Sequence, residues 1–310
     1  MKELIIICAL PGAGKTTLVE EYKAKGFTVL SRDIEGGDMA GLAKKLSSLL
    51  VIKDKIILDN TSITAEMRKP FVELGKLWGF NVTCVHLATS MEDAQVNAVT
   101  RMIRRHGKLF RTQDDYKQCK DPNAFPPAAL FSAKKNFEKP TKAEGFDDII
   151  TVPFKRIPNG YTNKGLILDY DGNLRTTKSG NIYPKHPDDV MILPNRKERL
   201  LEYLNKGYIL LGASNQSGIG KGDLTEAMAI ACFERTNELL GIKIDYTFCP
   251  HKVPPITCYC RKPSVGIGVE FVEKYKLNPA ETIMVGDMTS DKTFATRNGF
   301  IYYDTNDFFR

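Results

Sequence analysis

The amino-acid sequence predicts an α/β protein of two domains, each built on a parallel β-sheet that helices cover on both faces. The chain has 310 residues, which suits two domains of ordinary size better than one large core. In both halves, short apolar runs typical of buried strands alternate with segments of helical periodicity. Residues 154–164 are rich in turn formers, so we place a linker there and domains at residues 1–157 and 164–310.

Hydrophobic periodicity locates the individual elements. In the first half we expect strands at Leu4–Ala9, Thr28–Leu30, Ile56–Leu58 and Val82–Leu87, and helices at Ala65–Trp78 and Glu92–Arg105. In the second half we expect strands at Gly165–Asp169, Tyr208–Ala213, Tyr246–Phe248, Thr282–Val285 and Phe300–Tyr303. Parallel strands share one edge for their carboxyl ends, and open α/β sheets bind ligands at that edge.

The composition is that of a soluble globular protein, with 42% hydrophobic and 26% charged residues. No apolar run approaches the length of a membrane span, and the apolar start of the chain runs into a glycine-rich loop rather than a cleavage site. We therefore expect a cytoplasmic protein without a membrane partner. The net charge of +7 is compatible with a polyanionic partner, although a solvated surface explains it nearly as well.

A phosphate-binding loop follows the first predicted strand. Its glycines allow backbone N–H groups to converge on phosphate oxygens, with a lysine for the β and γ phosphates and a hydroxyl for Mg²⁺. The residues concerned are Gly12, Ala13, Gly14, Lys15, Thr16 and Thr17. Ala9 stands where the usual pattern has its first glycine, and a chance glycine turn is the alternative. The strand-then-helix context favours ATP binding with Thr16 as a Mg²⁺ ligand.

Two carboxylates and two arginines are candidates for the same site. Asp33 and Asp59 come directly after the second and third predicted strands, so we expect both at the edge that carries the loop. One would accept a proton from an attacking hydroxyl and the other would position substrate or metal, although Asp often only caps a helix. Arg101 and Arg105 share one face of a helix, which suits a lid over the transferring phosphate. A solvated basic face is the alternative for these arginines.

A second constellation of polar residues follows strands of the second half. Asp169 and Asp171 lie at the end of a buried strand and point to the same side, so Asp169 could attack phosphorus while Asp171 protonates the leaving oxygen. Ser214 and Asn215 end the next strand and could bind a phosphoryl oxygen. Lys262 would supply a cation for the transition state.

Carboxylates for Mg²⁺ complete this constellation. Asp287 and Asp291 follow a further apolar strand, and together with Asp169 and Asp171 they would hold the metal. The motifs resemble, in order and context, those of the haloacid dehalogenase superfamily, which implies a Rossmann-like phosphatase domain. Asn173 stands where this superfamily usually has threonine, and it can make a comparable hydrogen bond in the turn.

Four soft or borderline metal ligands cluster within a short segment. They are Cys249, His251, Cys258 and Cys260. Their number and chemistry predict a closed tetrahedral Zn²⁺ site of structural type, and reduced thiols packed in a loop are the alternative. The cluster directly precedes Lys262, so the metal would support the loop that carries a catalytic lysine.

The whole chain resembles the polynucleotide 5′-kinase/3′-phosphatase family, in the domain order of the bacteriophage type. The resemblance rests on PGAGKTT, the Arg32–Asp33 pair, Asp59-Asn60-Thr61 and the Arg101/Arg105 helix, and on the segments Pro140–Phe146, Thr176–Gly180 and Ser214–Gly222. It implies a P-loop kinase domain and a phosphatase domain that together repair RNA or DNA ends, with a polynucleotide ligase as a candidate partner. By this resemblance Asp33 is the base for a 5′-hydroxyl, and Arg32 and Asp59 contact the substrate. Gly36 stands where the phage type has an arginine.

Two other functions remain open from the sequence. The zinc loop is more similar to histidinol-phosphatase and heptose-bisphosphate-phosphatase relatives, which favours a kinase/phosphatase of a phosphorylated sugar or nucleotide. A non-catalytic scaffold that binds nucleic-acid ends is a third hypothesis, supported by Ala9 and Asn173 alone. The scaffold hypothesis is opposed by the presence of Lys15, Asp33, Asp169 and Asp171.

Overall fold

The computed structural model describes residues 2–253 and 258–310, which form two compact units. Of the described residues, 2–98 and 120–156 form the N-terminal unit, and 99–119, 157–253 and 258–310 form the C-terminal unit. The predicted domain limits of 1–157 and 164–310 stay a prediction. Within the two described ranges, no helix is both long and apolar enough to cross a membrane.

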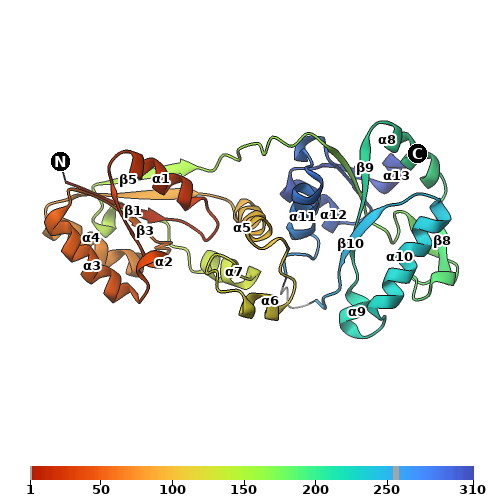
Figure 1. The fold of residues 1–310 in the computed structure, drawn as a ribbon, viewed down its shortest axis with the longest axis horizontal. Coiled ribbons are helices and arrows are strands. Elements are labelled where there is room, and N and C mark those ends of the chain that lie inside the picture. Colours follow the sequence, from red (N-terminus) through yellow and green to blue (C-terminus); the bar gives the residue numbers. More distant parts are fainter. Residues whose placement is uncertain (1, 254–257) are drawn as a thin grey trace. The chain divides into compact units, whose positions relative to one another are not determined.

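The N-terminal unit is built on a parallel sheet with the strand order β2-β3-β1-β4-β5 (Figure 1). The strands are β1 (Glu3–Cys8), β2 (Thr28–Ser31), β3 (Lys55–Asp59), β4 (Asn81–Ala88) and β5 (Asp148–Pro153). The predicted strands of this half are thus confirmed within one or two residues, while β5 was not predicted. Because β1 is central, the loop that follows it lies between the ends of β3 and β4.

Helices cover both faces of this sheet because its apolar residues point alternately to either side. Leu4 and Ile6 of β1 pack with α3 and α4, whereas Ile5 and Ile7 pack with α1, α5 and α7. The helices are α1 (Lys15–Ala24), α2 (Arg32–Glu35), α3 (Met39–Ile52), α4 (Ala65–Leu77), α5 (Met91–His106) and α7 (Pro127–Lys135), with a 3₁₀ turn at Lys142–Glu144.

The C-terminal unit has a second parallel sheet with the order β10-β9-β6-β11-β12. Its strands are β6 (Lys164–Leu168), β9 (Tyr208–Asn215), β10 (Asp245–Cys249), β11 (Ile283–Gly286) and β12 (Ile301–Asp304). A small antiparallel pair, β7 (Arg175–Thr177) and β8 (Val190–Ile192), was not predicted. The central strand β6 lies between β9 and β11, so the predicted motifs after these three strands meet at one edge.

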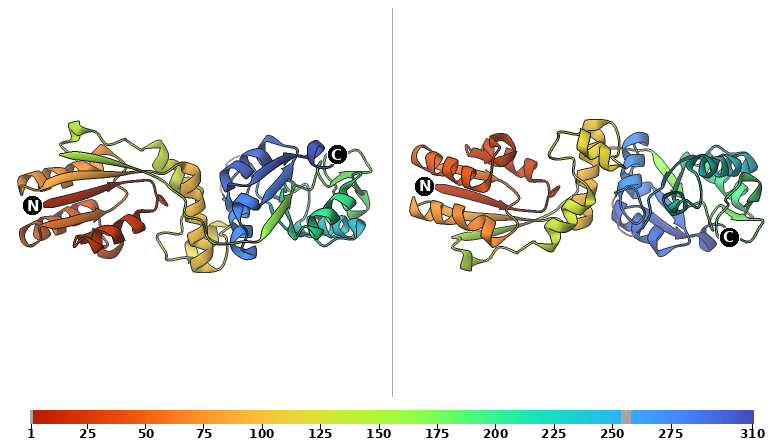
Figure 2. Two further views of the ribbon diagram at one scale, coloured as in Figure 1. Left: turned by 90° about the horizontal axis from the view of Figure 1, so that it is seen from above. Right: turned by 90° about the horizontal axis from the view of Figure 1, so that it is seen from below.

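Helices lie on both sides of this sheet as well. Figures 1 and 2 show α8, α10 and α13 on one side and α11 and α12 on the other. The bounds are α8 (Arg196–Asn205), α9 (Ser217–Lys221), α10 (Glu226–Leu240), α11 (Gly266–Tyr275), α12 (Thr289–Asn298) and α13 (Thr305–Phe308), with 3₁₀ turns at Pro187–Asp189 and Pro279–Glu281. The apolar core on the α8 side includes Leu166, Leu168 and Phe233.

The segment Val99–Cys119 joins the C-terminal unit through its side chains. It contains the end of α5 and the helix α6 (Gln113–Gln118). Arg104 donates two hydrogen bonds to the Glu273 carboxylate at 2.9 and 2.8 Å, and Arg111 donates to Glu270 at 2.6 Å. These charged contacts give the segment its place in the C-terminal unit.

Candidate functional sites

The loop after β1 has a backbone that only glycine adopts easily. Gly12 has a φ of 78° and Gly14 a φ of 93°, both in the left-handed region. A Cβ atom on Gly12 would lie 2.5 Å from the carbonyl oxygen of Ala94, so no side chain fits there. Gly14 is the N-cap of α1, which places Lys15 and Thr16 in the first turn of that helix. This is the geometry that the sequence predicted for a phosphate-binding loop.

Two side chains anchor the loop from the neighbouring strand and helix. Asn97 Nδ2 donates to the carbonyl of Gly12 at 2.9 Å, and Thr89 Oγ1 donates to the carbonyl of Ala13 at 3.0 Å. Sequence reasoning missed both residues, although Thr89 directly follows the end of β4. These two hydrogen bonds fix the positions of two loop carbonyls.

Lys15, Asp33 and Asp59 gather near the carboxyl ends of β1, β2 and β3. Ser31 and Asp59 are register partners, and Asp33 lies in α2, which follows β2 at once. Burial raises the pKa of Asp59; the Lys15 charge and a Ser31 hydrogen bond oppose this rise, while the Asp33 charge adds to it. Both predicted partners therefore act on Asp59 electrostatically. Arg32 precedes Asp33 and is exposed.

Arg101 and Arg105 lie in the part of α5 that belongs to the C-terminal unit. The loop residues and Asp33 belong to the N-terminal unit. The role of these arginines as a lid over ATP phosphates therefore stays a prediction.

A buried arginine supports the loops around the N-terminal site. The Arg68 side chain is fully buried and forms a two-pronged ion pair with Glu144, with Nε–Oε2 at 2.6 Å and Nη2–Oε1 at 2.9 Å. Its Nη1 donates to the carbonyls of Ser62 and Glu138 and to the Cys8 sulfur. Arg68 thus ties the end of β1 to the segment after Asp59, and the sequence analysis did not identify it.

The second site centres on one lysine between carboxylates. The Lys262 side chain is 2% exposed, and its Nζ lies 2.8 Å from Asp169 Oδ1 and 2.7 Å from Asp291 Oδ1. Asp169 follows β6, Asp291 lies in the first turn of α12, and Lys262 precedes α11. The structure therefore brings together three predicted residues that are far apart in the sequence. Residue Gly172 closely approaches Asp287, since a Cβ on it would lie 2.7 Å from Asp287 Oδ2.

The carboxylates of Asp169, Asp287 and Asp291 fit a divalent cation. Their ligand oxygens lie within 4.8 Å of one another. Burial raises the pKa of Asp169 to about 6; the Lys262 charge opposes the rise and the Asp291 charge adds to it. Three carboxylates and one ammonium leave an excess of negative charge, which a Mg²⁺ ion would compensate with the oxygen ligands that it prefers. The Asp171 carboxylate is not in this group but contacts Arg175 and Gln216.

The side-chain amide of Asn173 makes hydrogen bonds within the turn that follows Asp169. Its Nδ2 donates to the Asp169 carbonyl at 2.8 Å, and its Oδ1 accepts from Thr305 Oγ1 at 2.8 Å. Asn173 is completely buried, and it holds the backbone that carries the nucleophile candidate. The expected turn hydrogen bond of asparagine is therefore present.

The two residues at the end of β9 have different surroundings. The Asn215 side chain donates to the Lys262 carbonyl and accepts from the Lys262 backbone N–H, both at 2.9 Å. It therefore positions the lysine, and its predicted contact with substrate stays a prediction. Ser214 is buried and accepts a hydrogen bond from Gln216 Nε2 at 2.9 Å.

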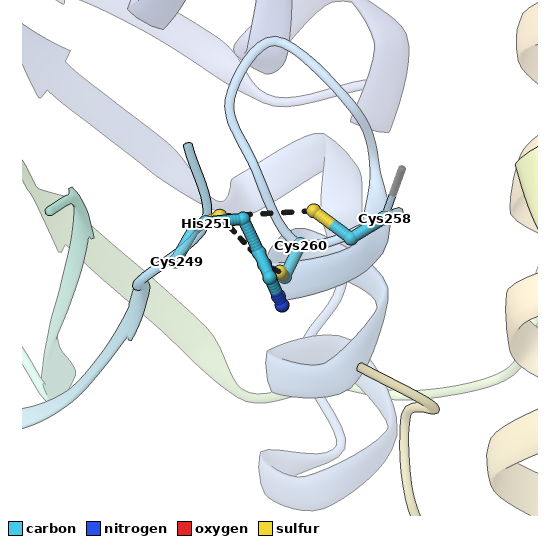
Figure 3. A group of neighbouring side chains, drawn as sticks. All are labelled: Cys249, His251, Cys258 and Cys260. Atoms are coloured by element: carbon cyan, nitrogen blue, oxygen red, sulfur yellow. Dashed lines mark hydrogen bonds between the residues drawn. The ribbon is translucent and has the colours of Figure 1, made fainter. Parts of the chain in front are cut away.

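The predicted zinc ligands converge between the last residue of β10 and the start of α11, as Figure 3 shows. The Sγ atoms of Cys249 and Cys258 are 3.7 Å apart, and His251 Nδ1 lies 3.3 Å from the Sγ atoms of both Cys249 and Cys260. Tetrahedral zinc with Zn–S bonds of about 2.3 Å requires sulfurs about 3.8 Å apart. The four side chains thus have the chemistry and the spacing of a closed Zn²⁺ site.

Fold and sites together define a P-loop nucleotide-binding domain joined to a phosphatase domain of the haloacid dehalogenase superfamily. A family model described as AAA domain matches residues 4–120, and one described as polynucleotide kinase 3 phosphatase matches residues 164–309. The chain therefore combines, in this order, a match to an AAA-domain model and a match to a polynucleotide kinase 3 phosphatase model.

Several proteins share part of this sequence. A bifunctional polynucleotide phosphatase/kinase of Schizosaccharomyces pombe is 28% identical over 155 residues, which are 50% of this chain and 34% of that protein. A probable D-glycero-D-manno-heptose-1,7-bisphosphate 7-phosphatase of Thermoplasma volcanium is 37% identical over 139 residues, 43% of this chain and 92% of its own length. A chain of a solved Pnkp1/Rnl/Hen1 RNA repair complex is 14% identical, with a TM-score of 0.33 and coverages of 98% and 95%.

Proposed function

We propose that the protein repairs nucleic-acid ends by adding a phosphate to 5′-hydroxyls and removing phosphate from 3′ ends. The observation that carries this proposal is the presence, in one chain, of a loop with phosphate-binding geometry and of a buried carboxylate–lysine site within the match to the polynucleotide kinase 3 phosphatase model. The first site would take the γ-phosphate from ATP. The second would release inorganic phosphate.

In the kinase reaction, Lys15 and the loop amides bind the phosphates of ATP, and Thr16 holds the Mg²⁺ ion. Asp33 removes the proton from the 5′-hydroxyl, while Arg32 and Asp59 orient the acceptor. The supporting geometry is the common location of Lys15, Asp33 and Asp59 at one sheet edge. When bound, Mg²⁺ compensates the charge of the transferring phosphoryl group.

In the phosphatase reaction, Asp169 attacks phosphorus and Asp171 protonates the leaving 3′-oxygen. Lys262 holds the Asp169 carboxylate by a 2.8 Å contact and stabilises the charge of the phosphoryl oxygens. Ser214 and Asn215 line the adjacent strand end. Asp169, Asp287 and Asp291 would hold Mg²⁺, which would supply further positive charge for the phosphoryl group.

Zinc has a structural role in this proposal. Cys249, His251, Cys258 and Cys260 leave no open coordination position for a substrate or water. The last of these ligands, Cys260, lies two positions before Lys262, so a bound zinc would help to hold the segment that presents this lysine.

Single substitutions separate the two activities. The unmodified protein should transfer label from γ-labelled ATP to a 5′-hydroxyl oligonucleotide, and Asp33→Ala should abolish this transfer. Asp169→Ala should remove 3′-phosphatase activity and leave kinase activity intact. Loss of both activities in either variant, with the fold unchanged, would contradict two separate sites. Matched RNA and DNA ends identify the preferred nucleic acid.

A second candidate function is a kinase/phosphatase of a phosphorylated sugar. It is favoured by the 37% identity with the Thermoplasma volcanium protein over the phosphatase half. Release of phosphate from a sugar bisphosphate, without release from 3′-phosphorylated oligonucleotides, would support this function instead. A polynucleotide ligase remains the expected partner of the first function, because joining requires the 5′-phosphate and 3′-hydroxyl that the two reactions produce.

A further inference from the structure

Both oxygens of the Asp171 carboxylate are held by side chains that the reaction scheme does not use. Arg175 Nε donates to Asp171 Oδ1 at 2.7 Å, and Gln216 Nε2 donates to Asp171 Oδ2 at 3.0 Å. Arg175 is 1% exposed and Gln216 is 5% exposed. A carboxylate that is held at both oxygens has one orientation rather than several.

The two holding side chains are themselves fixed. Arg175 Nη1 donates to the Cys232 carbonyl at 2.7 Å and to Thr236 Oγ1 at 3.0 Å, and its guanidinium stacks against Phe233 with 4.7 Å between Cζ and the ring centre. These partners lie in one stretch of α10. The orientation of Asp171 is therefore set by a helix outside the site.

Gln216 connects Asp171 to the end of β9. The same Nε2 atom donates to Asp171 and to Ser214 Oγ, which lies 2.9 Å away. The backbone N–H of Gln216 donates to the Cys249 carbonyl at 2.8 Å, which fixes the residue from the neighbouring strand. Asp171 is thus held from two independent elements, α10 through Arg175 and the β9 end through Gln216.

We propose that Arg175 and Gln216 are positioning residues that aim Asp171 at the leaving oxygen of the phosphatase substrate. This proposal rests on the proposed function. In the first step, the bond from Asp169 oxygen to phosphorus forms, the bond from phosphorus to the 3′-oxygen breaks, and the proton of Asp171 moves to that oxygen. In the second step, water attacks phosphorus, the Asp169–phosphorus bond breaks, and a water proton returns to Asp171.

A purely structural role of Arg175 is the competing explanation, because a buried arginine between β7 and α10 would also stabilise the fold. The two roles differ in their dependence on the leaving group. An alkoxide such as a nucleoside 3′-oxygen leaves poorly without a proton, whereas p-nitrophenolate leaves readily without one. Correct positioning of Asp171 therefore matters for the first kind of substrate and little for the second.

The test compares kcat/KM for a 3′-phosphorylated oligonucleotide and for p-nitrophenyl phosphate. For each substrate, kcat/KM reports only the steps up to formation of the aspartyl-phosphate. Full loss of a general acid costs about 10²–10⁴-fold, so we expect Arg175→Met and Gln216→Met each to lower the oligonucleotide value by about 10–100-fold. The p-nitrophenyl phosphate value should change by less than about threefold, and Arg175→Lys should restore part of the loss.

Equal losses for both substrates, or no loss for either, would overturn the positioning role. Gln216→Met decides the question if Arg175→Met does not fold, because Gln216 is held by Ser214 and Cys249 at the strand ends. Retained p-nitrophenyl phosphate turnover then shows that Asp169 is intact. Asp171→Asn is the reference variant. If Asp171→Asn does not lose more kcat/KM for the oligonucleotide than for p-nitrophenyl phosphate, the acid role of Asp171 in the proposed function is wrong. If Asp171→Asn shows this larger loss but Arg175→Met and Gln216→Met do not, only the positioning role is wrong.

Discussion

Replacement of Arg68 by methionine removes a fully buried cation of the N-terminal unit while keeping most of the side-chain volume. Glu144, which is 13% exposed, then loses its two-pronged partner, and the carbonyls of Ser62 and Glu138 lose a donor. Breaking a buried ion pair by removing one partner costs about 3–5 kcal/mol. For a domain of this size, we expect the unfolding midpoint of the N-terminal unit to fall by roughly 10–15 °C.

Differential scanning calorimetry measures this effect, with the transition of the C-terminal unit as an internal reference that should not move. The matched control is the double variant Arg68→Met/Glu144→Gln. This double variant no longer contains the uncompensated carboxylate. Its loss of unfolding free energy should therefore be smaller, by at least about 1 kcal/mol, than the sum of the losses in the two single variants. A fall of less than about 3 °C for Arg68→Met, or strict additivity of the two changes, would refute this reasoning.

The pH dependence of the unfolding free energy is a second test of the Arg68–Glu144 ion pair. Burial raises the pKa of Glu144, but hydrogen bonds from Arg68 and Thr141 outweigh it and hold the pKa below its usual range. A depressed folded-state pKa adds stability above the unfolded value of about 4.3, and this contribution disappears as the pH falls further. The stability difference between the wild-type protein and Arg68→Met should therefore narrow below about pH 4.3.

Three further substitutions test the loops and the metal. Gly12→Ala should abolish ATP binding in a calorimetric titration, because the new Cβ would meet the backbone carbonyl of Ala94. A Cβ on Gly14 would meet no atom within 4 Å, so Gly14→Ala should lower the free energy of unfolding by only about 1–2 kcal/mol, for the positive φ at that position. Elemental analysis should find about one zinc per chain. Cys258→Ser should lose this zinc, while Cys119→Ser should keep it. Asn173→Ala should lower phosphatase kcat by about tenfold and leave kinase activity unchanged, since it removes a donor to the nucleophile's backbone; equal loss of both activities would contradict this.

The strand ends and their motifs could be predicted because their signals are local. Each consists of a short apolar run followed by glycines or carboxylates, and parallel pairing then collects these ends at one edge. Asp169, Lys262 and Asp291 are the best example, since the sequence predicted a common site and the structure links them by two short contacts. The zinc ligands also lie within one short segment.

Residues whose contacts are with partners far away in the sequence were harder to predict. Arg68 lies on the buried stripe of α4 with Phe71, Val72 and Gly75, and an arginine on such a stripe indicates a buried ion pair. The partner Glu144 is far away in the sequence, so periodicity could find the arginine but not its function. The sequence correctly placed Asn215 at the strand end near the site. Its hydrogen bonds to the Lys262 backbone could not be predicted, because they depend on the conformation of the loop that carries Lys262.

Two departures from the usual motifs were the only support for a non-catalytic scaffold, and the structure accommodates both. Ala9 is completely buried in the apolar core below the loop, and its N–H donates to the Thr61 carbonyl at 3.0 Å. It is not among the positive-φ residues, so the described backbone does not require glycine there. Asn173 has a donor and an acceptor partner for its amide. Because neither substitution disturbs the backbone that carries the phosphate loop or Asp169, both departures are compatible with an enzyme whose two sites are intact.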